Sequence, residues 1–260
     1  MHSPRNQTPR IASAAYAYWH ERQARTGFFA ATGELLAALW EFARDSTPSR
    51  LRSRYGDADY DWDHRVNTTS GAVGWRDRLL GVLHSPYQPT EPGLFREMIE
   101  ALAQVPGLNL ADFTFIDLGS GKGRTLLMAS DYPFRRIIGV ELLLSLHRIA
   151  ELNLAQYQRD SQRCSALESV CADAPSSALP AGPLLIYLFN PFGEEGLRRT
   201  IANLKQNVEI NPRPVFVLYH NPQLEHVLTG AAFLKKIAGT HQYSIFKADS
   251  KALEREADPA

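Results

Sequence analysis

The feature that constrains this chain most is a regular alternation of apolar, strand-like runs and helical segments between about residues 111 and 249. Apolar runs such as FTFIDLG, RIIGVEL, GPLLIYLFN and RPVFVLYHN alternate with segments of helical periodicity such as SLHRIAELNLAQYQ. This alternation is typical of a parallel sheet with helices on both faces, whose buried strands are continuously apolar. The last two runs, FLKKIAGTH and YSIFKA, predict a closing antiparallel pair. We therefore expect a doubly wound α/β fold.

The chain before this region has a different character. Residues 1 to about 55 have a helical pattern, and the stretch from about 56 to 93 is rich in aromatic, glycine and proline residues that are typical of loops. We expect residues 1–93 to form a helical and loop extension that serves as a lid or substrate region, residues 94–249 to form the main domain, and residues 250–260 to form a flexible tail.

The extension carries an apolar stripe and a basic cluster. One group of apolar residues recurs at helical spacing and predicts a single packing face; its members are Leu35, Leu36, Leu39, Trp40 and Ala43. Arg50, Arg52 and Arg54 follow it. We interpret the arginines as a solvated face, with an anionic substrate or partner site as the alternative.

Composition argues against several classes of function. Lys+Arg and Asp+Glu both number 28, so the formal net charge is zero and gives no general attraction to nucleic acid or anionic membranes. The two cysteines form no disulfide framework, and the His/Cys pattern has no metal-site spacing. No apolar run approaches the roughly 20 residues of a membrane span, and the first residues lack the apolar core of a secretory signal. We expect a cytoplasmic protein without a metal, nucleic-acid or membrane partner.

A glycine-rich turn, FIDLGSGKGR, joins the first predicted strand to the next helix. Gly119, Gly121 and Gly123 permit unusual backbone angles and close approach of a ligand, and ligands of open α/β sheets bind at the carboxyl ends of strands. The G-x-G-x-G spacing is not the G-x-G-x-x-G of dinucleotide sites, and Gly123 stands where a P-loop needs Ser or Thr. Asp117 would repel a pyrophosphate but would pair with an ammonium group. S-adenosyl-L-methionine has an ammonium group and no phosphate.

Two further acids follow the next two predicted strands. Glu141 closes the second strand about twenty residues after the glycine turn, where a carboxylate can accept two hydrogen bonds from ribose hydroxyls. Asp173 follows the third strand and is placed to accept from the adenine amino group. Three acids at three successive strand ends predict a common nucleoside site.

The motifs DLGSGKGR, GVEL, CADA and LFNPF resemble those of the class I S-adenosylmethionine-dependent methyltransferases, in order and separation, over about residues 86 to 249. The resemblance implies a Rossmann-like seven-stranded sheet of order 3-2-1-4-5-7-6 with the last strand antiparallel. It implies that Asp117 and the glycine loop, Ser120 included, hold the methionine part of the cofactor. Glu141 would hold the ribose, and Asp173 with Ala174 the adenine.

A narrower likeness concerns the segment ahead of the glycine loop. Tyr87 and Thr90, taken with the loop and the LFNPFG segment, resemble the catalytic core of the non-SET histone-lysine methyltransferases. Those enzymes have a Tyr-x-x-Thr segment there and Asn-Asn-Phe after strand four, where this chain has Asn-Pro-Phe. The likeness implies that Tyr87 and Thr90 close over the methionine end. We take it as kinship of the core and not as evidence for a histone substrate.

The segment after the fourth strand points to the methyl acceptor. Asn190-Pro191-Phe192 resembles the Asn-Pro-Pro-Tyr/Phe motif of amino-group methyltransferases, which implies that Asn190 binds at the cofactor and accepts hydrogen bonds from the attacking N–H while Phe192 packs on it. We expect N-methylation of a protein lysine or a small-molecule amine. The alternatives are O-methylation of a small metabolite, with His220 or His64 as a candidate base, and a non-catalytic cofactor-binding scaffold.

Overall fold

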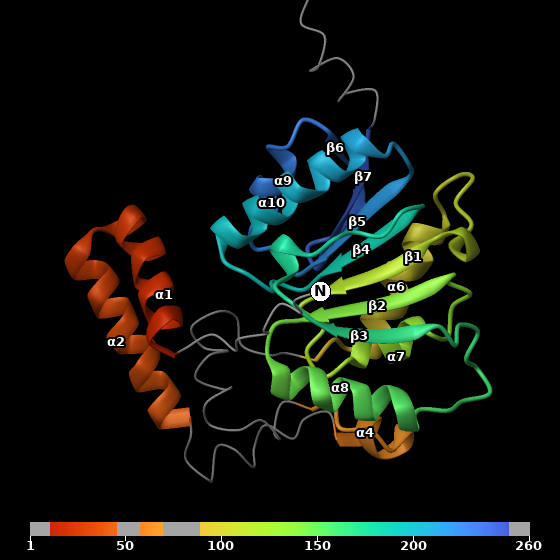
Figure 1. Cartoon of the computed structure of the whole chain (residues 1–260), viewed down its shortest axis with the longest axis horizontal. Coiled ribbons are helices and arrows are strands. Elements are labelled where there is room, and N and C mark those ends of the chain that lie inside the picture. Colours follow the sequence, from red (N-terminus) through yellow and green to blue (C-terminus); the bar gives the residue numbers. More distant parts are fainter. Residues whose placement is uncertain (1–10, 46–57, 70–88, 250–260) are drawn as a thin grey trace, which may run out of the picture.

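The computed structural model describes residues 11–45, 58–69 and 89–249, and its centre is a seven-stranded sheet of order β3-β2-β1-β4-β5-β7-β6 (Figure 1). The strands are β1 (Thr114–Leu118), β2 (Arg136–Glu141), β3 (Leu167–Cys171), β4 (Leu184–Leu188), β5 (Val215–His220), β6 (Leu234–Gly239) and β7 (Tyr243–Ala248). The first five pair in parallel, and β7 runs antiparallel to both β5 and β6. The predicted doubly wound α/β fold and the sheet order implied by the resemblance to class I methyltransferases are confirmed.

Helices cover both faces of the sheet, and a helical hairpin lies beyond the carboxyl ends of the parallel strands (Figure 1). The helices of the hairpin are α1 (Ile11–Thr26) and α2 (Phe28–Asp45), and those around the sheet are α4 (Ala58–His64), α6 (Pro92–Ala103), α7 (Arg124–Ala129), α8 (Leu144–Gln156), α9 (Glu194–Ile210) and α10 (Glu225–Thr229), with 3₁₀ turns η2 (Leu110–Asp112) and η3 (Ala174–Ser176). No helix within these described segments has the length and apolarity needed to cross a bilayer.

The alternation of side chains along the central strands divides the core into two layers. On β1, Ile116 packs in a cluster with residues of α9 and α10, whereas Phe115 packs in a second cluster with residues of α6 and α7. Successive side chains of a strand point to opposite faces, so a strand covered on both sides is apolar throughout. Every residue of β1 and β4 is buried, which brings the carboxyl ends of both strands into the protein interior.

Two short helices differ from the sequence-based expectation. Helix α4 lies in the stretch predicted to be irregular, and α10 lies between the fifth and sixth strands, where no element was expected. They span seven and five residues, which is too short for helical periodicity to stand out from a loop. Tertiary contacts supply what the local pattern lacks, as the interactions of Asp61 in α4 show below.

The predicted apolar face of the N-terminal helices is divided between packing and solvent. Ala31 and Ala38 of α2 are buried, whereas Leu36 and Trp40 are 62% and 70% exposed. The prediction of one packing face is therefore wrong for Leu36 and Trp40, because the buried positions of α2 are occupied by alanines instead. The side chain of Ala43 and the arginines Arg50, Arg52 and Arg54 lie outside the described residues.

The hairpin packs on the main domain near the start of α8. Tyr18 of α1 and Leu35 of α2 contact a small cluster formed by Leu143 and Leu146. A second connection is the ion pair between Arg25 and Glu194, at the start of α9. Helix α1 thus reaches from the segment after β2 to the segment after β4.

Gly139 in β2 marks a close approach between the sheet and the glycine loop. A Cβ at this position would lie 2.6 Å from both Leu126 Cδ1 and Ser120 Oγ. We predict that Gly139→Ala lowers the free energy of unfolding, measured by urea denaturation, by about 1–3 kcal/mol, because it overpacks this contact. Gly33→Ala is the control: a Cβ there meets nothing within 4 Å, and alanine in an exposed helix interior adds roughly 0.5–1 kcal/mol. Unchanged stability of Gly139→Ala would contradict the assigned contact.

Candidate functional site

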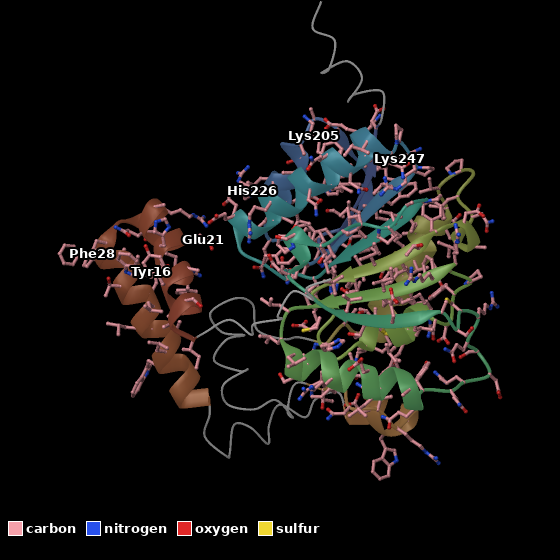
Figure 2. The ribbon with its side chains drawn as sticks, viewed as in Figure 1. Tyr16, Glu21, Phe28, Lys205, His226 and Lys247 are labelled. Atoms are coloured by element: carbon pink, nitrogen blue, oxygen red, sulfur yellow. The ribbon has the colours of Figure 1, made fainter. Side chains whose placement is uncertain are left out.

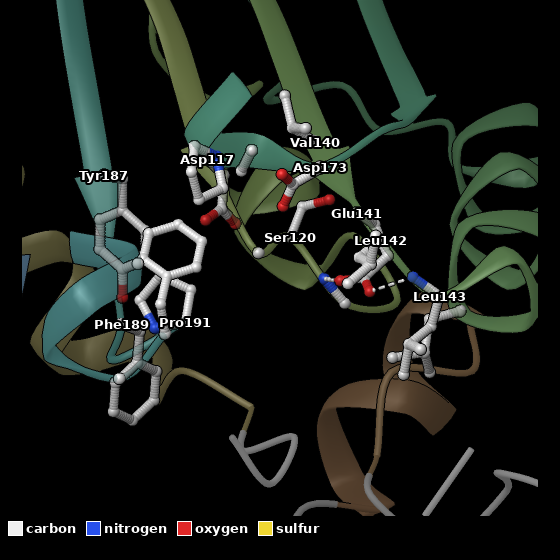
Figure 3. A pocket seen from close by; sticks show the side chains of 18 of the residues that line it. Asp117, Ser120, Val140, Glu141, Leu142, Leu143, Asp173, Tyr187, Phe189 and Pro191 are labelled. Atoms are coloured by element: carbon white, nitrogen blue, oxygen red, sulfur yellow. Dashed lines mark hydrogen bonds between the residues drawn. The ribbon is translucent and has the colours of Figure 1, made fainter. Parts of the chain in front are cut away.

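A cavity of about 400 Å³ opens at the carboxyl edge of the sheet, where β4, β1, β2 and β3 end (Figure 3). Its lining includes the three acids predicted from the sequence, namely Asp117, Glu141 and Asp173. Six other predicted site residues also line it: Thr90, Gly119, Ser120, Gly121, Ala174 and Phe192. The volume is within the range of small-molecule sites, so the three strand ends meet around one space that can hold a ligand.

The glycine loop adopts backbone angles that other residues resist. Gly119, Gly121 and Gly123 have φ of +87°, +55° and +83°, and a Cβ on Gly119 would lie 2.5 Å from Cβ of Pro191. Glycine is therefore required for the loop to approach the segment after β4. Gly123 precedes α7 as its N-cap and is not among the residues that line the cavity.

The N–H groups of this loop are used within the protein. Those of Gly119 and Ser120 donate to the carbonyl oxygen of Val140 at 2.8 and 3.1 Å, and that of Gly121 donates to Glu141 Oε2 at 2.8 Å. A phosphate-binding loop instead points successive N–H groups at its ligand. The loop is thus arranged for a ligand that does not depend on backbone donors.

Glu141 joins the glycine loop to the start of α8. Its second carboxylate oxygen accepts the N–H of Leu143 at 2.8 Å, and the side chain is 7% exposed. Burial raises the pKa of Glu141, while the hydrogen bonds from Leu143 and Gly121 lower it. A third backbone hydrogen bond, from Leu142, also lowers this pKa. A carboxylate has about four lone-pair sites, so the three backbone donors leave capacity for about one more.

Asp117 is the most deeply buried acid of the cavity. Its side chain is 3% exposed and accepts a hydrogen bond from Thr125. Burial raises the pKa of Asp117 to about 7, the Thr125 hydrogen bond opposes this rise, and the neighbouring charge of Glu141 adds to it. A cation close to this buried carboxyl group would stabilise its ionised form, so the site favours a positively charged ligand group.

Asp173 and Ala174 form the third side of the cavity, after β3. Ala174 is buried at 6% exposure, whereas Asp173 is exposed and accepts a hydrogen bond from Ser176 at 3.0 Å. Both line the cavity at the point predicted to hold the adenine.

On the opposite side, three polar groups form a buried hydrogen-bonded chain. Thr90 Oγ1 lies 2.8 Å from Tyr187 Oη, which lies 2.7 Å from His220 Nδ1. Thr90 and Tyr187 line the cavity, and Figure 3 shows Tyr187 in its wall. Sequence reasoning missed Tyr187 because an aromatic residue in an apolar strand reads as core. The sequence signal for a site residue was its polar hydroxyl group, on a residue close to the carboxyl end of the predicted fourth strand. Tyr87 lies outside the described residues.

Asn190 follows β4 in a left-handed backbone conformation, with φ of +45°. Its Oδ1 accepts from Tyr219 Oη at 2.8 Å, and its Nδ2 donates to the carbonyl oxygen of Asn221 at 2.7 Å. The neighbouring Phe189, Pro191 and Phe192 line the cavity, whereas Asn190 does not. The catalytic and cofactor-binding role of Asn190 stays a prediction.

The candidate base His64 lies elsewhere. Its Nδ1 contacts the carbonyl oxygen of Tyr60 at 2.7 Å, and its Nε2 accepts from Arg159 at 2.6 Å. His64 does not line the cavity, so the structure does not bring it to the predicted site.

The hairpin contributes two lining residues that no sequence pattern indicated. Ala17 and Glu21 of α1 line the cavity, and Figure 2 shows Glu21 on the side of α1 that faces the main domain. A Cβ on Gly193 would lie 2.7 Å from either carboxylate oxygen of Glu21. The hairpin therefore forms part of the cavity wall.

Among the described residues, no group of three or more His, Cys, Asp or Glu side chains is arranged to hold a metal ion.

The two cations of the glycine loop bind the segment that follows α4. Lys122 is fully buried and its Nζ donates to Asn67 Oδ1 at 2.9 Å and to the carbonyl oxygen of Thr69 at 2.5 Å. Arg124, 2% exposed, donates through Nε to Thr68 Oγ1 at 2.7 Å. Burial lowers the pKa of Lys122 to about 8. These side chains thus tie residues 58–69 to the loop.

No family model matches the sequence, and no curated protein matches it. The structure is similar to solved methyltransferase structures. A ribosomal protein L11 methylase from Lactobacillus delbrueckii subsp. bulgaricus is 15% identical with a TM-score of 0.40, and the match covers 60% of this chain and 76% of that one. A dimethyladenosine transferase from Plasmodium falciparum is 11% identical with a TM-score of 0.45, and the match covers 65% of this chain and 66% of that one.

A third structure, an RNA methyltransferase from Salinibacter ruber in complex with S-adenosyl-L-homocysteine, is 17% identical with a TM-score of 0.37, covering 62% of this chain and 92% of that one. Similarity at this level concerns architecture only. The assignment of the fold rests on the strand order and on the pairing described above.

Asp61 in α4 is the main anion of the segment bound by the loop. It accepts the N–H groups of Thr68 and Thr69 at 2.7 and 2.8 Å and pairs with Arg124 Nη2 at 3.4 Å. We predict that Asp61→Asn lowers the free energy of unfolding by about 2–3 kcal/mol, because the N–H groups of Thr68 and Thr69 lose a charged acceptor and the buried Arg124 loses the charge of Asp61. Chemical denaturation measures the loss. The control Asp63→Asn, on the exposed side of the same helix, should stay within about 0.5 kcal/mol of wild type; equal losses would refute the buried pair.

Proposed function

We propose that this protein is an S-adenosylmethionine-dependent methyltransferase that transfers the methyl group to a nitrogen acceptor. The observation that carries the proposal is that Asp117, Glu141 and Asp173, at the ends of three adjacent strands, line one cavity together with the glycine loop. A cavity walled by carboxylates suits a ligand with cationic and hydroxyl groups.

The residues present fit S-adenosylmethionine part by part. Asp117 would pair with the ammonium of the methionine part, the remaining lone pair of Glu141 would accept from a ribose hydroxyl, and Asp173 would accept from the adenine amino group. The engaged N–H groups of Gly119, Ser120 and Gly121 disfavour a dinucleotide or nucleoside triphosphate. The negative charge of the three acids and the engagement of these N–H groups within the protein therefore both disfavour a phosphate group.

The chemistry asks the protein mainly for orientation. The bound sulfonium supplies an already activated methyl group, so the side chains of this chain need to hold the acceptor in line and keep it uncharged. Phe189, Pro191 and Phe192 provide an apolar wall beyond β4, which favours the neutral form of an amine. Oδ1 of Asn190 accepts a hydrogen bond from Tyr219, and a carboxamide oxygen is the kind of acceptor that an attacking N–H group requires.

The acceptor class follows from these groups. An amine that loses its proton to water needs no strong base, whereas an alcohol acceptor needs one. Burial lowers the pKa of His220 to about 4, which makes it a weak base at neutral pH. A protein lysine or a small-molecule amine is therefore favoured over a hydroxyl compound as the methyl acceptor.

The raised pKa of Asp117 makes cofactor binding depend on pH. The carboxyl group is protonated below about pH 7, and only its ionised form pairs with the ligand ammonium, which stays protonated up to about pH 7.7. We predict that affinity for S-adenosylhomocysteine rises from pH 5.5 to pH 7.5, by about tenfold per pH unit at the acidic end, with proton release on binding. Titration calorimetry in two buffers of different ionisation enthalpy measures both quantities.

The control ligand is 5′-methylthioadenosine, which lacks the ammonium group of S-adenosylhomocysteine and should therefore bind with little pH dependence. Asp117→Asn should abolish the pH dependence seen with S-adenosylhomocysteine. If neither ligand bound the wild-type protein, the cofactor assignment would be wrong. Equal pH dependence for both ligands would show that Asp117 does not contact the ammonium.

The proposed role of Asn190 is tested by removing its side chain while keeping its backbone angle. Asn190→Gly preserves φ of +45° without strain, and we predict a fall in the turnover number of about a hundredfold with unchanged affinity for S-adenosylhomocysteine. Transfer of labelled methyl to lysine-containing peptides and small primary amines measures the rate, with phenols as the hydroxyl comparison.

Asn221→Gly is the control for this experiment, because Asn221 also has a positive φ, of +48°, and receives the Asn190 amide through its backbone carbonyl only. It should retain the wild-type rate. Full activity of Asn190→Gly would remove Asn190 from the mechanism, and label found only on phenols would favour the O-methylation alternative.

A further inference from the structure

The chain of Thr90, Tyr187 and His220 runs from the cavity wall into the protein interior. The three residues come from three places in the sequence, just ahead of α6, in β4 and at the end of β5, and are 3%, 1% and 6% exposed. Thr90 and Tyr187 line the cavity, and His220 does not. His220 stacks against Phe189 with 3.9 Å between ring centroids, so the ring at the inner end of the chain is held in place.

The direction of the hydrogen bonds follows from the acidity of the groups. Tyr187 has one phenol proton and two partners, so it donates to one partner and accepts from the other. Burial raises the pKa of Tyr187 well above its usual value and lowers that of His220 to about 4, so both groups are neutral at pH 7. The phenol is the stronger acid and the imidazole nitrogen the stronger base. Tyr187 therefore donates to His220 Nδ1 and accepts from Thr90.

With the hydrogen bonds in this direction, the hydroxyl of Thr90 can accept a hydrogen bond from a ligand but cannot donate one. A hydroxyl has one proton and two lone pairs, and the proton of Thr90 is directed at Tyr187 Oη. Asp117 lines the same cavity as Thr90 and Tyr187, and its charge adds to the raised pKa of Tyr187. Two acceptors, the Asp117 carboxylate and Thr90 Oγ1, thus meet at the place proposed for the methionine part of the cofactor.

We infer that Tyr187 and His220 are positioning residues that fix the proton of the Thr90 hydroxyl, so that Thr90 accepts a hydrogen bond from the ligand ammonium and does not donate one to the ligand carboxylate. The inference rests on the proposed function, because the ammonium is that of S-adenosylmethionine. The opposite direction of the chain would make Thr90 a donor, and it would then recognise the carboxylate. The two directions therefore predict different ligand preferences.

Three ligands separate these cases: S-adenosylhomocysteine, its decarboxylated analogue, which keeps the amine, and 5′-methylthioadenosine, which has neither group. In titration calorimetry at pH 7.5, Tyr187→Phe should weaken the first two by about tenfold, the effect of losing a hydrogen bond to a charged group, and leave 5′-methylthioadenosine unaffected. Weakening of S-adenosylhomocysteine alone would assign Thr90 to the carboxylate and overturn the inference. Equal weakening of all three would overturn it as well, because it would indicate a collapsed cavity.

Substitutions of His220 test the inner end of the chain. His220→Leu removes the acceptor of the Tyr187 proton and should reproduce the loss seen in Tyr187→Phe. His220→Asn places a carboxamide oxygen near the position of Nδ1 and should restore most of the affinity for the amine-bearing ligands. Equal losses in the two variants would mean that the ring only fills space, which would overturn the inference.

Tyr243→Phe is the control, because Tyr243 is a buried tyrosine of β7 that pairs with His220 in the sheet but does not line the cavity. It should keep the wild-type preference among the three ligands, and a shift equal to that of Tyr187→Phe would overturn the assignment to Tyr187. If wild-type protein bound none of the three, the proposed function itself would fall. If it bound all three but Tyr187→Phe changed none of them, only the present inference would be lost.

Discussion

The attachment of the glycine loop to β2 is the constraint on which the rest of the site depends. The carbonyl oxygen of Val140 accepts two successive N–H groups of the loop, and the carboxylate of Glu141 accepts a third. This attachment requires the missing side chain of Gly139, next to which Ser120 and Leu126 pack. It holds the loop against the ends of β1 and β2, so Asp117 and Glu141 face one cavity from adjacent strands.

The attachment of the glycine loop to β2 also determines which charged groups face the cavity. Because the loop N–H groups are used internally, the loop adds little positive potential, and its two cations, Lys122 and Arg124, bind the segment after α4. Acidic side chains from three strand ends remain. The three acids stabilise a ligand cation, and the N–H groups of Gly119, Ser120 and Gly121 are not available to a phosphate. The arginines of the lining are Arg124, which binds Thr68 and Asp61, and Arg199. Charge and backbone geometry therefore select the same ligand class.

Much of this arrangement was predictable from sequence because it is local. The central strands are apolar runs of five or six residues, the glycines follow one strand directly, and the acids stand at strand ends that a parallel sheet necessarily brings to one edge. The lining of the cavity by Glu21, the partners of Lys122 and Arg124, and the Tyr187–His220 contact were not predictable. Each joins segments tens of residues apart, and a tyrosine in β4 or a glutamate in α1 has no local feature that distinguishes it from core or surface.

The difference between the two halves of the site has a physical origin. The cofactor half is built from the ends of strands whose spacing is set by backbone hydrogen bonds, so the sequence pattern determines where its acids lie. The acceptor half is built from side chains whose orientation depends on their partners, as with Asn190, which Tyr219 and Asn221 hold by its carboxamide. The positions of the proposed cofactor-binding acids can therefore be inferred from spacing, whereas the proposed acceptor contact depends on how the hydrogen bonds with Tyr219 and Asn221 orient the carboxamide of Asn190. Single hydroxyl groups, that of Tyr187 beside Thr90 and that of Tyr219 beside Asn190, therefore influence specificity in both halves of the proposed site, because each fixes whether its neighbour donates or accepts.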